Sequence, residues 1–109
     1  MRTQLMAVAL AALAAPANAE TFYDRACSAV EGVAEQIIEL RVKGAPKERL
    51  IQAFERMEDG IAAPIVKRWA VKAVDDAYAM SESSAAAAWR TGEFRQRVGT
   101  ECRTFWEDL

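Results

Sequence analysis

The sequence contains no histidine and only two cysteines in its 109 residues. Without an imidazole, the usual zinc sites and every catalytic triad that depends on a histidine base are excluded. The sequence also has neither a glycine-rich phosphate-binding loop nor a G-x-S-x-G nucleophile motif. Its net charge of −2 argues against a nucleic acid as partner, because proteins that hold phosphate backbones carry a surplus of basic residues. We therefore expect no metal, no other cofactor and no enzymatic activity.

An apolar run long enough to cross a membrane is missing too. The run over residues 5–15 is shorter than the roughly 20 residues that a spanning helix needs. It is followed by Ala17-Asn18-Ala19, the small-x-small pattern that signal peptidases cut. We therefore predict a signal peptide over residues 1–19, cleaved after Ala19, and a single helical domain over residues 20–109 that is exported to the periplasm and does not span the membrane. The alternative is that the N-terminal run forms a hydrophobic helix of the domain itself.

The two cysteines, Cys27 and Cys102, lie near opposite ends of the predicted domain. In an oxidising compartment a pair of cysteines forms one disulfide, and two cysteines permit only one connectivity. No C-x-x-C motif is present, which argues against a catalytic redox role. We predict that this disulfide is structural.

Apolar residues recur at spacings of three and four through most of the domain, as in amphipathic helices. Glycines and prolines mark the ends of the predicted helices, which cover residues 22–43, 46–59 and 64–80. A last helix follows the serine-rich 81–84 segment and runs to Trp106, and the sequence leaves open whether it divides at Thr91-Gly92. The pattern predicts an all-α fold: a small antiparallel bundle of four helices, or five if the last one is split, stapled by one disulfide. Up-down-up-down order supports this, because it places both cysteines at the same end of the bundle.

Three basic residues surround a tryptophan on the third predicted helix: Lys67, Arg68 and Lys72 flank Trp69. This group is a candidate surface for a protein partner or an anionic ligand, since indole rings attract cations and hold them in place. The alternative is that Trp69 belongs to the core and the basic residues form its solvated edge.

The other tryptophans, Trp89 and Trp106, are candidates to line an apolar groove together with Trp69. The alternative is that these rings fill space beside the many alanines of a small core. Both interpretations use the same residues, so the sequence does not separate them.

Carboxylates recur every four residues on the first helix, at Glu31, Glu35 and Glu39. Such a row could supply a general acid and base, but a catalytic carboxyl group normally needs burial to raise its pKa, and this row lies off the apolar stripe. The preferred interpretation is a solvated face, on which Lys43 and basic residues of neighbouring helices reduce the repulsion between the carboxylates.

The order of these features resembles that of small, exported, all-helical proteobacterial proteins with two cysteines, most of them uncharacterised. The resemblance rests on the two cysteines, on a serine-rich cap and on two motifs, Ile-x-x-Leu-Arg-x-x-Gly and Val-x-x-x-Tyr, which here are Ile37, Leu40, Arg41, Gly44, Val74 and Tyr78. It implies a fold and a compartment and no active site. The periplasmic acid-stress chaperones are similar only in size, helicity and the single disulfide.

From these features we expect a soluble periplasmic helical protein that is not an enzyme and that binds another protein or serves in envelope stress. The alternative is a small-ligand carrier with a tryptophan-lined groove, followed by an enzyme that uses the glutamate row. In the absence of histidine, an acid response would depend on carboxylates that protonate below about pH 4.5. Whether the protein is a monomer or a homodimer stays open.

Overall fold

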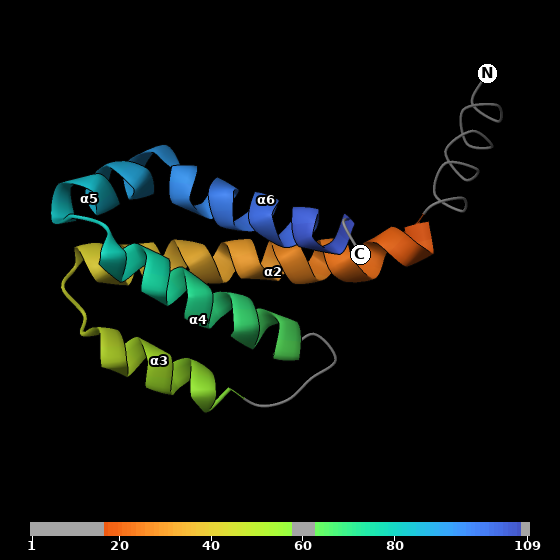
Figure 1. The fold of residues 1–109 in the computed structure, drawn as a ribbon, viewed down its shortest axis with the longest axis horizontal. Helices are drawn as coiled ribbons and strands as arrows, with labels where there is room; N and C mark the ends of the chain where they lie inside the picture. The colour runs from red at the N-terminus through yellow and green to blue at the C-terminus, as the bar shows by residue number, and fades with distance from the viewer. Residues whose placement is uncertain (1–16, 58–62, 108–109) are drawn as a thin grey trace, which may run out of the picture.

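The computed structural model describes residues 17–57 and 63–107, and its regular secondary structure is entirely helical (Figure 1). The helices are α2 (Ala17–Val42), α3 (Lys47–Glu55), α4 (Ala63–Ala79), α5 (Glu82–Thr91) and α6 (Glu93–Glu107). The all-α prediction is therefore confirmed. The segment 1–16, which holds most of the predicted signal peptide, lies outside the described residues, so the predicted cleavage after Ala19 stays a prediction.

Successive long helices run in opposite directions, so that the first turns of α2 and the last turns of α6 lie at the same end (Figure 1). The central element is α2, which packs against α4, α5 and α6, whereas α3 packs chiefly on the outer side of α4. The predicted antiparallel bundle is thus observed, with α3 as an added layer on a core of α2, α4 and the α5–α6 pair.

The last predicted helix is divided, which resolves the alternative at Thr91-Gly92. Gly92 has a φ of 75°, in the left-handed region that glycine reaches without steric cost, and its N–H donates to the carbonyl oxygen of Trp89. The Thr91 hydroxyl accepts from the N–H of Glu93 at 3.3 Å, which satisfies a free donor in the first turn of α6. The bundle therefore has five helices within the described ranges.

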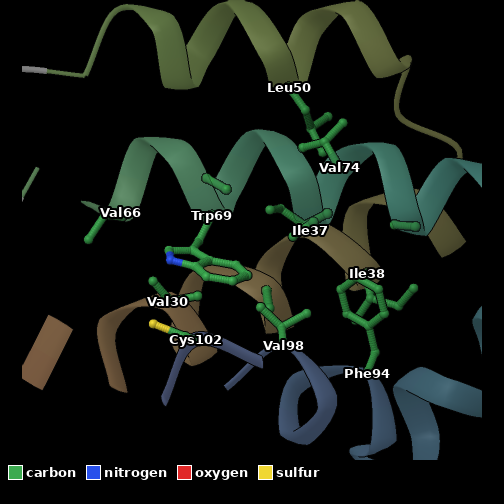
Figure 2. Packing of buried hydrophobic residues seen from close by; sticks show 14 of the residues in the cluster. Val30, Ile37, Ile38, Leu50, Val66, Trp69, Val74, Phe94, Val98 and Cys102 are labelled. Carbon is green, nitrogen blue, oxygen red and sulfur yellow. The ribbon is translucent and has the colours of Figure 1, made fainter. Parts of the chain in front are cut away.

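The core is built from β-branched, alanine and aromatic side chains of all five helices. Phe94, Ile37 and Ile38 are its largest fully buried members. Figure 2 shows the Trp69 ring extending from α4 toward α2 and α6, and Leu50 of α3 pointing onto Val74 of α4. Alanines on the contacting faces let the helix axes come close, which offsets the small number of large apolar side chains.

One contact group fastens the α2–α3 turn to the C-terminal end of α4. Arg41 donates to the carbonyl oxygens of Ala77 at 3.4 Å and Met80 at 3.1 Å, and the Tyr78 hydroxyl donates to the carbonyl oxygen of Ala45. Gly44 turns the chain between them, with a φ of 90°. Two of the sequence motifs quoted above therefore meet in space: Arg41 of the first contacts Tyr78 of the second, and Tyr78 donates to Ala45, the residue after Gly44 of the first.

Candidate functional site

The disulfide lies at the end of the bundle opposite the Arg41 contacts. Cys27 of α2 and Cys102 of α6 are bonded, their Cα atoms are 5.7 Å apart, and both residues are fully buried. The bond joins the beginning of α2 to the end of α6, as the predicted antiparallel order requires. The disulfide therefore fixes the position of α2 relative to α6 at this end of the molecule.

A row of aromatic rings begins one helical turn beyond the disulfide. Tyr23 precedes Cys27 by four residues and Trp106 follows Cys102 by four, so each ring lies on the same helix face as its cysteine. The two rings stack, with centroids 4.4 Å apart and planes inclined by 27°. The row continues to Phe22 on one side and to Phe105 and then Trp69 on the other, through edge-to-face contacts of 5.1, 5.1 and 5.9 Å.

This aromatic row (Phe22, Tyr23, Trp106, Phe105, Trp69) runs from the solvent into the core. Its inner member, Trp69, is only 7% exposed, whereas Phe22 and Tyr23 at the outer end are 38% and 42% exposed. Among the described residues, the other large hydrophobic side chain with comparable exposure is Leu40, at 43% and far from the row. Two adjacent exposed rings that continue an ordered stack are the features of a contact surface rather than of a scattered apolar residue.

Two indole nitrogens within the row are without a hydrogen-bond partner. The Nε1 atoms of Trp69 and Trp106 are buried, and no acceptor contacts either of them. Buried indole N–H groups usually find an acceptor, and one that does not costs about 1–3 kcal/mol. The row therefore contains two buried donors that have no acceptor among the described residues.

The four residues of the predicted basic patch differ in burial and in the contacts that they make. Trp69 is core, in agreement with the alternative interpretation, and Lys67 is half-buried. Lys72 points across to α6, where its Nζ lies 2.9 Å from Glu101, and it also contacts Asp76 at 3.0 Å. Hydrogen bonds to these two carboxylates raise the pKa of Lys72.

Arg68 is exposed and lies beside the aromatic row. Its guanidinium carbon lies 4.8 Å from the centre of the Phe105 ring, the usual distance of a cation–π contact. A cation held there by a ring is available to an acidic group of a bound partner.

A second cross-link between α2 and α6 lies beside the disulfide. The Arg103 guanidinium donates to Asp24 and Ser28, each at 3.3 Å, and to Glu31. The hydrogen bond that Arg103 donates to Glu31 is the main cause of the raised pKa of Arg103. Gly99 makes room for this contact, because a Cβ at that position would overlap the Glu31 side chain.

The glutamate row of α2 is engaged at both of its ends. Glu31 pairs with Arg103, and Glu39 pairs with Lys43 at 2.9 Å. Glu35, between them, is half-buried. Over residues 17–57 and 63–107, no group of three or more acidic or cysteine side chains is arranged to hold a metal ion. The row behaves as an ion-paired face, as the preferred interpretation had it.

The tryptophans proposed for a groove are not gathered at one site. Trp69 and Trp106 both contact Phe105, but Trp89 lies on α5, at the opposite end of the bundle (Figure 1). A shallow depression between α4 and α6 contains no tryptophan in its lining, which consists of Lys72, Asp76, Ala79, Met80, Arg97 and Glu101. Polar and charged groups predominate there, so this depression does not suit an apolar ligand.

Phe22, Tyr23 and Phe105 were not among the residues singled out from the sequence. For Tyr23, the signal that could have found it is the spacing from the cysteines: Tyr23 stands four positions before Cys27, as Trp106 stands four positions after Cys102. Once the disulfide is accepted, this spacing places both rings on the same side of the bond.

Every helix in the described part of the chain is too short or too polar to cross a membrane. In comparisons with known proteins, the chain matches no family model, no curated protein and no solved structure, so the residues described above are the basis for a function.

Proposed function

We propose that this protein is an exported, disulfide-stapled helical module that binds another protein through the exposed end of its aromatic row. The observation that carries the proposal is the pair of exposed rings, Phe22 and Tyr23, of which Tyr23 stacks on the half-buried Trp106. The disulfide supports export, because such bonds persist in oxidising compartments such as the periplasm.

The chemistry of the row favours a protein as the partner. Tyrosine and tryptophan are enriched at the centres of protein interfaces, because they offer a large rigid surface together with one polar group. Tyr23, which is 42% exposed and stacked on Trp106, offers such a surface at the outer end of the row. Arg68 at the edge of the row adds a cation that pairs with acidic groups.

The two other candidate functions find less support. A small-ligand carrier needs a concave apolar pocket, whereas the exposed rings lie on an outer surface and the depression between α4 and α6 is polar. An enzyme would need a carboxyl group in a buried site, whereas Glu31 and Glu39 are ion-paired near the surface.

The test is affinity capture from a periplasmic extract with the oxidised protein, at pH 7 and again at pH 3. We expect one stoichiometric partner at pH 7, lost in Tyr23→Ser and retained in Leu40→Ser. Leu40 is the matched control, because it is as exposed as Tyr23 but lies outside the row. Capture that both variants retain, or that both lose, contradicts the proposed surface. Many clients at pH 3 alone would instead make the protein an acid-stress chaperone.

A further inference from the structure

We infer that the Cys27–Cys102 disulfide gates this binding surface, so that only the oxidised protein presents it. In the reduced chain the first turns of α2 and the last turns of α6 separate, Tyr23 leaves Trp106, and the rest of the bundle stays folded. The inference rests on the proposed function in one respect only, namely that the aromatic row is the surface to be gated.

The position of the disulfide controls the distance between the stacked rings of Tyr23 and Trp106. Tyr23 and Trp106 each lie one helical turn from a bonded cysteine, on the side away from the main core. A cross-link one turn away limits how far the two rings can separate. Without it, the stack depends on its own contact, which for an aromatic pair is worth about 0.5–1.5 kcal/mol.

On the terminal side of the disulfide, between the bond and the outer ends of the two helices, few interactions hold α2 to α6. Phe22, Tyr23, Asp24 and Arg25 are all exposed, so this stretch buries little apolar surface. The Arg103 contacts to Asp24 and Glu31 are partly solvated, and such ion pairs contribute about 0–1 kcal/mol each. This end of the bundle therefore depends on the covalent bond more than any other described part does.

The remainder of the bundle has its own anchors. Phe94 of α6 packs in the main core with Ile37 and Ile38 of α2, each at least two helical turns from the cysteine of its own helix. At the far end, Arg41 and Tyr78 fasten the α2–α3 turn to α4 without involving either cysteine. Local release of one end without loss of the other is therefore the expected response to reduction.

The redox step is a two-electron exchange with a dithiol. The Cys27–Cys102 bond breaks, and each of its two sulfurs gains one electron and one proton. The external dithiol that supplies them is oxidised to a disulfide. The reverse step, with a protein disulfide as the oxidant, assembles the surface. Because both cysteines are fully buried, a reductant reaches them only after the end has opened, so the oxidised surface persists once formed.

The experiment compares hydrogen exchange in the oxidised protein with that in a variant carrying Cys27→Ala and Cys102→Ala. We expect amide exchange over residues 22–27 and 103–107 to become at least about tenfold faster in the variant, and exchange over residues 77–80 to change less than about twofold. The inference is overturned if amide exchange becomes faster to the same degree at both ends of the bundle, or if the variant is unfolded. It is also overturned if amide exchange changes at neither end.

Arg103→Gln, with the disulfide intact, separates the covalent bond from the ion pairs. We expect exchange over residues 22–27 in this variant to stay within about twofold of the unchanged protein. An acceleration as large as that in the cysteine variant would assign the role to the Arg103 contacts and overturn the inference.

Partner capture distinguishes the two proposals. Failure of the oxidised protein to capture any protein refutes the proposed function, while the exchange data still decide whether the disulfide holds this end together. Equal capture by the oxidised protein and by the cysteine variant overturns the gating and leaves the proposed function in place.

Discussion

The guanidinium carbon of Arg41 lies 5.2 Å from the centre of the Tyr78 ring, and both side chains donate hydrogen bonds to main-chain carbonyls at the junction of α2, α3 and α4. Arg41 satisfies acceptors at the C-terminal end of α4, where the helix leaves its last carbonyls free and where a positive charge is favourable. Arg41 thus caps the C-terminal end of α4 and packs on the Tyr78 ring. Tyr78 in turn holds the α2–α3 turn through its hydrogen bond to Ala45.

The pH dependence of stability tests the role of Tyr78. Burial raises the pKa of Tyr78 above 10.0, and the charge of Arg41 reduces that effect. Because the folded state favours the neutral phenol, this stabilisation is complete below pH 10 and is lost as the pH rises through the raised pKa. We expect Tyr78→Phe to lower the free energy of unfolding by about 1 kcal/mol at pH 7. Its deficit relative to the unchanged protein should shrink between pH 9 and pH 12 in urea titrations. A deficit that grows with pH would contradict this, and Tyr23→Phe is the matched control.

Loss of the disulfide should lower thermal stability strongly. The bond closes a loop with a sequence separation of 75 residues, for which the chain-entropy model gives about 4 to 4.5 kcal/mol. In a domain of this size we expect Cys27→Ser, or reduction, to lower the thermal midpoint by about 10 °C or more, measured by calorimetry. A decrease of less than about 2 °C would show that the bond is not a staple.

Two helical glycines form a matched pair for substitution by alanine. A Cβ at Gly32 meets nothing within 4 Å, so Gly32→Ala should stabilise α2 by about 0.5–1 kcal/mol. A Cβ at Gly99 overlaps Glu31, which must then move away from Arg103. We expect Gly99→Ala to be less stable than Gly32→Ala by about 1 kcal/mol or more in denaturant titrations. Equal stability of the two variants would refute the close contact between α2 and α6.

The serine-rich segment before α5 contains one serine that caps the helix. The Ser81 hydroxyl accepts from the N–H of Ser84 at 3.2 Å, and the Ser81 backbone is extended, as an N-cap requires. We expect Ser81→Ala to lower the free energy of unfolding by about 1 kcal/mol, and Ser83→Ala by less than about 0.5 kcal/mol. A larger loss in Ser83→Ala than in Ser81→Ala would mean that the cap is assigned to the wrong residue.

The helices themselves could be predicted because their apolar residues follow the helical period, but some of their ends could not. α2 already covers residues 17–21, before the predicted start at Phe22, so Thr21 does not act as the first cap. α3 ends at Glu55 rather than at residue 59, and the N–H groups of Arg56 and Met57 tighten the chain there with hydrogen bonds to Gln52 and Phe54. The break at Gly92 depends on a backbone angle that glycine permits but does not demand.

The candidate site was predictable only where neighbours in sequence are also neighbours in space. The basic patch grouped Lys72 with Trp69, and the Lys72 Nζ atom lies 6.0 Å from the centre of the Trp69 ring, but no pattern within α4 reveals that Lys72 pairs with Glu101 of α6. Likewise, the stack of Tyr23 on Trp106 joins distant parts of the chain. Such contacts depend on how the helices pack against one another. The disulfide was the one contact between distant residues that could be predicted from the sequence.

The distance in sequence between the two cysteines also bears on how the chain is synthesised. No other cysteine exists in the sequence, so Cys27 has no partner in its own chain until Cys102 has been made, 75 positions later. During that interval its thiol can pair only with a different molecule. Oxidation of this protein therefore has one correct product and no scrambled isomer within the chain, and its errors are covalent dimers whose amount rises with protein concentration.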